Sequence, residues 1–171
     1  FKFAFTKIGN PLYVTYFSVT PYKLGPKQAV KFQFVPVRCV SGVDVEDDQP
    51  VDKKNPDYLR ARMVESLKQD DRCFEMRIQK QVDPCVQLVE DSMIEWEESD
   101  TRFRRVAFLK IPKQIFSTSS IDEQCENLSF APWHSLPEHR PLGEVNRVRR
   151  KVYEKIASYR HEMNKVKCHE P

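Results

Sequence analysis

Three side chains near the C-terminus, Arg149, Tyr153 and Arg160, have types and a spacing that suit metal-ligand chemistry. The stretch 143–164 contains no proline and no internal glycine, which predicts one long helix. At roughly 100° per residue, the three side chains fall within about 40° of one another on that helix. A cation one turn from a phenol stabilises the phenolate, and phenolate is an anionic oxygen ligand suited to ferric iron, haem iron included.

The same positions also have a plainer interpretation. An apolar stripe runs along the predicted helix beside them, and we expect it to face the core; it consists of Val148, Val152, Ile156, Tyr159 and Met163. A tyrosine at the edge of such a stripe is commonly a core residue with a polar tip. Arginines beside it commonly pair with glutamates on the helix, here Glu144, Glu154 and Glu162. Helix geometry alone leaves both interpretations open.

Residues 1–40 are predicted to form strands. Phenylalanine alternates with other residues from Phe1 to Phe5, and aromatic and β-branched residues fill Leu12 to Thr20. A third run, 30–37, alternates again after a turn at 23–27. Consecutive strands with tight breaks predict an antiparallel meander or a portion of an antiparallel β-barrel.

The rest of the chain divides by composition into four parts. Residues 41–55 are acidic and sparsely apolar, which predicts a solvated loop. Residues 56–125 are predicted to hold a helix that begins after Asn55 and strands at 72–82 and 106–111. Residues 126–142 are rich in proline and are predicted to be irregular, and the long helix covers 143–164. The expected fold class is α+β, with a single domain over 1–171.

The composition excludes several classes of protein. The chain has 171 residues, about one domain, of which 40% are hydrophobic and 31% charged. A net charge of +3 is too small for a dedicated polyanion binder. The apolar runs are far shorter than the ~18 residues that span a bilayer. We expect a globular protein with no membrane span.

The chain has five cysteines, which are widely spread and include no CxxC pair. Neither a zinc site nor a redox dithiol is indicated by this spacing. In a chain of this size the pattern favours reduced structural thiols over a disulfide framework, and an intracellular location over a secreted one.

Several stretches resemble the catalase-like haem protein superfamily, in particular its catalase-related peroxidases and allene oxide synthase-type members. Residues 127–134, NLSFAPWH, resemble the family's NLSFNPWH, and residues 137–143, PEHRPLG, resemble its PEHRPLG. Residues 146–153 are similar to its NRxRRxVY pattern, and 83–96 to a segment that begins DP and ends EW. The resemblance extends over nearly the whole chain and places it in the C-terminal, proximal-haem half of the family's fold.

This resemblance implies a ferric, tyrosinate-ligated haem cofactor and peroxidase-type oxidoreductase activity on hydroperoxides. The family's Arg-x-x-x-Tyr motif places the axial ligand of the haem iron at Tyr153, and at Arg149 the arginine that holds its oxygen as phenolate. A family arginine seven residues beyond the ligand, which contacts a haem propionate, corresponds to Arg160. His134 and His139 belong to the family segment as structural residues rather than ligands.

The family also needs a histidine and an asparagine on the distal side of the iron, in a part of the chain before the proximal segment. The first histidine here is His134, inside that segment, so the chain is expected to supply the proximal side only. No catalytic acid–base residue is therefore assigned in it. An N-terminal half or a second chain would complete the pocket of a haem peroxidase.

Two other interpretations stay open. A catalase-like domain can serve as a haem-free, noncatalytic subunit with a structural role in a larger complex. The final helix also carries a small excess of lysine and arginine, which would suit nucleic acid, although the balanced overall charge disfavours that partner. A haem-binding protein that acts on hydroperoxides is the leading hypothesis.

Overall fold

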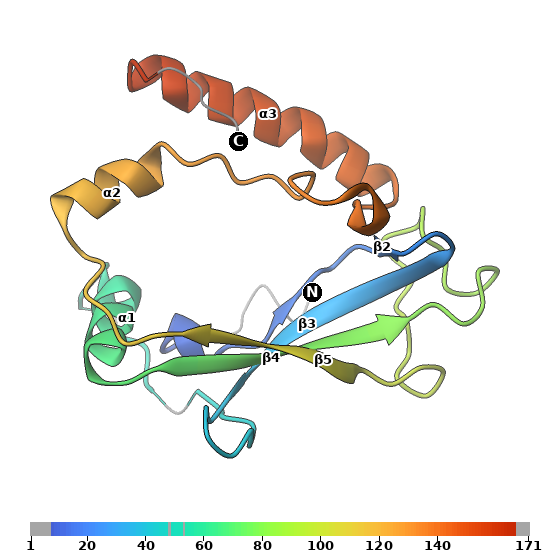
Figure 1. Ribbon diagram of the computed structural model, residues 1–171, viewed down its shortest axis with the longest axis horizontal. Helices are drawn as coiled ribbons and strands as arrows, with labels where there is room; N and C mark the ends of the chain where they lie inside the picture. The colour runs from blue at the N-terminus through green and yellow to red at the C-terminus, as the bar shows by residue number, and fades with distance from the viewer. Residues whose placement is uncertain (1–7, 48, 53, 167–171) are drawn as a thin grey trace. The chain divides into compact units, whose positions relative to one another are not determined.

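The computed structural model describes residues 8–47, 49–52 and 54–166 (Figure 1). The described helices are α1 (Tyr58–Gln69), α2 (Ser119–Glu126) and α3 (Glu144–Met163), with short 3-10 turns η2 (Pro11–Tyr13) and η3 (Pro137–His139). The strand expected at Phe1–Phe5 lies outside the described residues. Among the described helices, none combines the length and the apolar character needed to cross a membrane.

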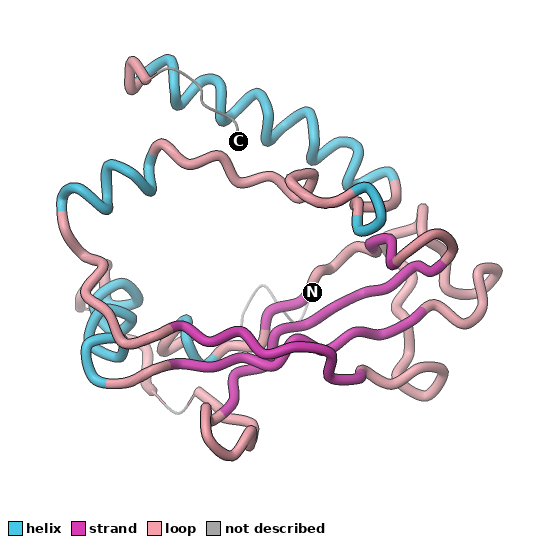
Figure 2. The backbone as a smooth tube through the Cα atoms, viewed as in Figure 1, coloured by secondary structure: helices cyan, strands magenta, loops and turns pink. Residues whose placement is uncertain are grey.

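The strands belong to one sheet, and they are β1 (Tyr16–Phe17), β2 (Tyr22–Leu24), β3 (Gln28–Val37), β4 (Arg72–Lys80) and β5 (Arg104–Ile111). Their order is β1-β3-β4-β5, and β2 also pairs with the long strand β3. The pairings of β1 and of β2 with β3 are antiparallel, with Tyr16 opposite Phe34 and Tyr22 opposite Val30. Figure 2 traces the strands in magenta.

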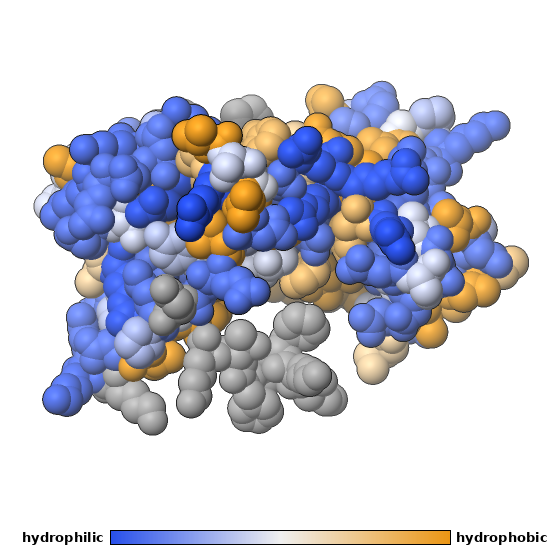
Figure 3. Space-filling model, turned by 90° about the horizontal axis from the view of Figure 1, so that it is seen from below, coloured by the Kyte–Doolittle hydropathy of each residue, from blue (hydrophilic) through white to orange (hydrophobic). Residues whose placement is uncertain are grey.

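The mixed α and β composition and the antiparallel pairing agree with the expectation, and the described strands form an open sheet that is not closed into a barrel. The segment expected to be a strand at 12–20 pairs with β3 over two residues only. The reason is local: Asn10 caps a 3-10 turn that Pro11 begins, and this turn occupies the start of the segment. At the other end of the sheet, β5 is exposed along its length except at Ile111. Apolar groups also reach the surface between hydrophilic ones on the face drawn in Figure 3.

The chain divides into two compact units, and β3 and β4 each contribute residues to both. The first unit comprises the chain up to Phe17 together with Gln33–Arg77 and Arg105–Ser117. The second comprises Ser18–Phe32, Ile78–Arg104 and the chain from Thr118 onward.

The core of the first unit forms around Leu12, Leu67 and Phe74, from η2, α1 and β4. Partly buried hydrophobic residues pack around them: Phe34, Met63, Ile111 and Phe116. Met63 and Leu67 lie one turn apart on α1, as expected of a helix with one apolar face.

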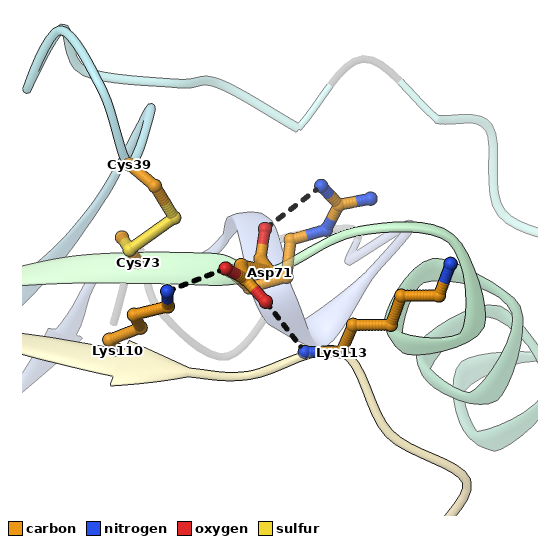
Figure 4. The surroundings of a disulfide bond; sticks show 6 residues. Cys39, Asp71, Cys73, Lys110 and Lys113 are labelled. Carbon is orange, nitrogen blue, oxygen red and sulfur yellow. Dashed lines mark hydrogen bonds and ion pairs between the residues drawn. A yellow bond between two sulfur atoms is a disulfide. The ribbon is translucent and has the colours of Figure 1, made fainter.

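A disulfide joins Cys39, in the loop after β3, to Cys73 in β4 (Figure 4). The expectation of reduced thiols is therefore wrong for this pair, because two distant segments of the first unit bring the sulfurs together. Cys85 and Cys125 are free and exposed. Cys168 lies outside the described residues.

Asp71 lies beside the disulfide, at the start of β4 (Figure 4). Its carboxylate accepts hydrogen bonds from Lys110 Nζ at 2.7 Å and from the backbone N–H of Lys113 at 2.8 Å. The Lys110 bond is the main cause of a lowered pKa of Asp71. These bonds fasten the end of β5 to the start of β4.

In the second unit, Gln79 organises the loop that joins β4 to β5. Its side chain is buried, and Nε2 donates to the carbonyl oxygens of Trp96 and Thr101, each at 2.8 Å. The Trp96 side chain is buried as well, with the Lys31 ammonium 4.9 Å from the centre of its ring. This loop is therefore held by side-chain bonds rather than by strands or helices.

The segment between α2 and α3 is irregular apart from η3, and Figure 2 draws it beside α3. His161 on α3 bonds through Nε2 to the Asn127 carbonyl oxygen at 2.8 Å. Asn164 Nδ2 donates to the Asn127 side-chain oxygen at 2.9 Å. Polar contacts thus attach the start of the segment to the last turn of α3.

Candidate functional site

Arg149 and Tyr153 lie one turn apart on α3 and contact each other. Arg149 Nη2 donates a long hydrogen bond, 3.4 Å, to the Tyr153 hydroxyl oxygen. The guanidinium carbon lies 5.5 Å from the centre of the phenol ring. Arg149 is half-buried, whereas 36% of Tyr153 is exposed. The structure therefore places a cation against a partly exposed phenol.

Arg160, two turns further along α3, bonds to a different part of the chain. Its Nη1 donates to the Glu126 carbonyl oxygen at 2.8 Å, and its Nη2 to that of Leu128 at 2.7 Å. These bonds fasten the end of α2 to α3. A guanidinium has five N–H donors, so the two bonds leave others available to a further acceptor.

Two residues that the sequence analysis missed lie against Arg149. Asn146, one turn before it on α3, has no exposed surface, and its side-chain oxygen accepts from Arg149 Nη1 at 3.3 Å. The other is Tyr22 in β2: burial raises the pKa of its hydroxyl, and the nearby charge of Arg149 opposes that shift without cancelling it. The spacing of three residues between Asn146 and Arg149 could have predicted that their side chains meet on a helix. Tyr22 is too distant in sequence for any spacing to predict its place near Arg149.

The apolar stripe of α3 is exposed, which overturns the expectation that it faces the core. Its members, Val148, Val152, Ile156, Tyr159 and Met163, are between 45% and 63% exposed. The face that the second unit buries instead carries Asn146, Ala157 and His161. The physical reason is that this face is held by hydrogen bonds, such as the one from Trp133 Nε1 to the Asn146 carbonyl oxygen at 2.8 Å.

A cavity of about 850 Å³ opens beside the first turns of α3. Apolar side chains of α3 and of the loop after β4 line it, including Val145, Val148 and Leu88. Arg149 also lines it, together with the acidic residues Glu90, Asp91 and Glu144. The guanidinium that contacts Tyr153 therefore borders a space that contains carboxylates.

Other arginines of α3 are engaged within the chain. Arg147 forms two hydrogen bonds to the Glu90 carboxylate, at 3.1 and 2.8 Å, and this pairing lowers the pKa of Glu90. Arg150 bonds to Glu154 at 2.9 Å. Arg147 and Arg150 therefore both have carboxylate partners within the chain.

Gly143 determines how α3 begins, and its replacement gives a first prediction. It caps the helix with φ at +84°, and a Cβ there would lie 2.5 Å from the Val89 carbonyl oxygen. We expect Gly143→Ala to lower the free energy of unfolding by more than about 1 kcal/mol, because a left-handed backbone and a clash with backbone combine. Urea unfolding measures the change.

Gly25 provides the matched control for that variant. It also has a positive φ, +65°, but a Cβ there would meet nothing within 4 Å. Gly25→Ala therefore isolates the effect of the left-handed backbone. It should lower the free energy of unfolding by less than Gly143→Ala does. Equal losses in the two variants would contradict a steric role for Gly143 against Val89.

Comparison with known proteins identifies the fold. No protein-family model and no curated protein matches the chain. Three solved structures match it over 89–90% of its length. One is a fungal catalase, with a TM-score of 0.68 and 18% sequence identity. The others are catalase A from Saccharomyces cerevisiae, with a TM-score of 0.70 and 18% identity, and a bacterial catalase, with a TM-score of 0.71 and 16% identity. The chain covers 31–33% of those catalases. The chain therefore has a catalase-like fold and spans about a third of the length of the catalases it matches.

Proposed function

We propose that this chain supplies the proximal side of a haem pocket in a catalase-like protein that acts on hydroperoxides. In this proposal Tyr153 would be the protein ligand of a ferric haem, Arg149 would stabilise its phenolate, and Arg160 would contact a propionate. The observation that carries the proposal is the Arg149–Tyr153 contact within a catalase-like fold. A cation beside a reachable phenol is the arrangement that a phenolate ligand requires.

The residues around Tyr153 fit such a group. The phenol is partly exposed, and the guanidinium of Arg149 lies against its oxygen. Val152 and Ile156 on the same helix are exposed and apolar, which suits the face of a macrocycle. When bound, a haem with an anionic axial ligand supplies the redox chemistry that cleaves the O–O bond of a hydroperoxide. The chain's own part is to hold the phenolate charge and to shield it with apolar side chains.

The distal side of the pocket must come from outside the described chain in this proposal. The chain spans about a third of the catalases it matches, and its first histidine is His134. We assign the other members of the exposed stripe of α3, Val148, Tyr159 and Met163, to the surface that an N-terminal half or a second chain would cover, because exposed apolar surface marks an interaction site. That portion would also bring the acid–base group that moves protons on the hydroperoxide.

A second candidate is a haem-free subunit with the same fold and a structural role in a larger complex. One observation favours it: Arg160, the propionate contact of the first proposal, already donates to the carbonyl oxygens of Glu126 and Leu128. In this candidate Arg149 and Tyr153 serve packing alone.

Titration of the full-length protein with ferric haem, followed by visible absorption, separates the two candidates. We expect wild-type protein to give a tyrosinate-type spectrum. Tyr153→Phe should weaken binding by roughly 100-fold or more, since even the loss of an outer partner of a metal ligand costs about 10–100-fold. Tyr13→Phe, which removes a hydroxyl from the first unit, is the matched control and should bind as wild type does. Equally weak binding by wild type and Tyr153→Phe would overturn the haem proposal in favour of the structural subunit.

A further inference from the structure

The disulfide between Cys39 and Cys73 (Figure 4) lies on the wall of a cavity of about 400 Å³ in the first unit. Both cysteines line the cavity, together with Tyr13 and the two arginines Arg38 and Arg72. A cavity of this size suits a small organic molecule. A molecule bound there would lie next to a sulfur–sulfur bond.

The two sulfurs of this bond differ in their access to solvent. Cys39 lies in the loop after β3 and is exposed, whereas Cys73 in β4 is only 7% exposed. In thiol–disulfide exchange a thiolate attacks one sulfur and expels the other, and the accessible sulfur is the one attacked. The burial of Cys73 therefore directs an incoming thiolate to the Cys39 sulfur.

The cavity also presents a guanidinium whose donors are only partly used. Arg72 Nε is buried and has no hydrogen-bond partner among the described residues. Its Nη1 donates a long bond, 3.4 Å, to the Asp71 carbonyl oxygen, and the guanidinium carbon lies 5.6 Å from the centre of the Tyr13 ring. A buried N–H without an acceptor is costly, and a carboxylate is the acceptor that a guanidinium binds most strongly. This side chain therefore favours a ligand with a carboxylate.

The acidic residues of the lining oppose such a ligand only weakly. The Asp71 carboxylate is already bonded to Lys110 Nζ and to the backbone N–H of Lys113. Glu46 is exposed, so water reduces the effect of its charge. The second arginine of the lining, Arg38, adds a further positive charge. Positive charge therefore dominates in the cavity.

The loop that carries Cys39 is attached to the first unit at other points as well. Asp44 pairs with Arg77 at 2.5 Å. The Asp47 carboxylate accepts a hydrogen bond from the backbone N–H of Asn10 at 2.9 Å. Because these contacts do not involve the disulfide, we expect this wall of the cavity to remain in place when the disulfide opens.

We propose that the cavity binds a small thiol that carries a carboxylate, and that the bound thiol exchanges with the disulfide at Cys39. The thiolate sulfur of the ligand bonds to Cys39 Sγ as the bond between the two cysteines breaks. The electron pair of the broken bond leaves with the Cys73 sulfur, which takes up the proton that the ligand's thiol released. The products are a mixed disulfide at Cys39 and a free thiol at Cys73. This site is independent of the proposed haem function.

The test compares two small thiols of similar size, mercaptoacetate, which carries a carboxylate, and mercaptoethanol, which is neutral. Acid stops the exchange, alkylation in denaturant labels the free thiols, and peptide mass spectrometry identifies the cysteine that carries the ligand. Each rate is divided by the rate of the same thiol with hydroxyethyl disulfide, which removes differences in intrinsic reactivity. We expect the ligand on Cys39, alkylated Cys73, and a corrected rate about 10-fold higher for mercaptoacetate.

Arg72→Leu tests the recognition of the carboxylate. It should reduce the preference for mercaptoacetate to about 2-fold or less and leave the rate with mercaptoethanol unchanged, because only the charged ligand uses the guanidinium. Arg102→Leu is the matched control, since it removes an exposed arginine from the second unit, and it should keep the full preference. If Arg72→Leu does not fold, salt decides the matter: the wild-type preference should fall between about 0.1 M and about 1 M salt.

Each contrary outcome overturns a stated part of the inference. Ligand on Cys73, or on neither cysteine, would overturn exchange at Cys39. Equal corrected rates for the two thiols, a full preference in Arg72→Leu, or a wild-type preference unaffected by salt would overturn the carboxylate site. The haem titration has its own readout in the second unit, so the failure of either proposal leaves the other standing.

Discussion

Phe74→Ala is expected to lower the free energy of unfolding by about 3–5 kcal/mol. Phe74 is 4% exposed and packs with Leu12 and Leu67 at the core of the first unit. Its ring also lies 6.2 Å, centre to centre, from that of Tyr16. The loss combines the transfer free energy of the ring with the cavity left behind. That cavity cannot collapse easily, because β4 is held between β3 and β5.

The matched control is Phe108→Ala in the neighbouring strand β5, where the side chain is 57% exposed. It should change the free energy of unfolding by less than about 1 kcal/mol, because little apolar surface returns to water. Urea unfolding of both variants with unchanged slopes gives the comparison. Similar losses at the two positions would show that Phe74 is not part of a close-packed core.

Loss of the disulfide is expected to have the next largest effect. Cys39→Ser should lower the free energy of unfolding by about 2–4 kcal/mol. The bond joins residues with a sequence separation of 34, so its removal restores conformational freedom to the unfolded chain. The same loss should follow when a reductant is added to the wild-type protein.

Cys85→Ser is the control for this prediction, because Cys85 is free and exposed. It should unfold at the same urea concentration as wild type under oxidising conditions. The prediction fails if a reductant leaves the unfolding of wild-type protein unchanged, or if Cys39→Ser and Cys85→Ser unfold alike.

Local signals in the sequence predict the elements that carry the site. Gly143 and the absence of proline after it predict a helix over 143–164, and the structure has α3 at Glu144–Met163. The spacing of Arg149 and Tyr153 places them one turn apart, and they do contact each other. Both results depend on residues within a few positions of one another, where helix geometry decides the outcome.

Long-range contacts account for what the sequence could not predict. Hydropathy favours Val152 and Ile156 as buried residues, yet the second unit buries Asn146, whose partners Thr20 and Pro21 are 126 and 125 positions away. No periodicity reports that an amide will find carbonyl and hydroxyl partners at such distances. Burial of a polar face is stable only because its hydrogen bonds are satisfied.

The same limit applies to the cysteines. Five of them allow many pairings, and the spacing of Cys39 and Cys73 does not single out their bond. The sulfurs meet because the loop after β3 returns to β4, a consequence of tertiary structure. Helix α2 was not predicted for a different reason: its eight residues are too few to show a clear apolar period.

The exposed strand β5 has a consequence for how the protein behaves in concentrated solution. Its eight residues include three basic and no acidic side chains, alongside the exposed Val106 and Phe108. Two of these basic residues, Arg105 and Lys110, pair with the carboxylates of Glu75 and Asp71. Charged side chains along an open strand discourage the strand of another molecule from adding to it. Replacement of the basic residues by apolar ones would therefore promote self-association of the protein through this strand.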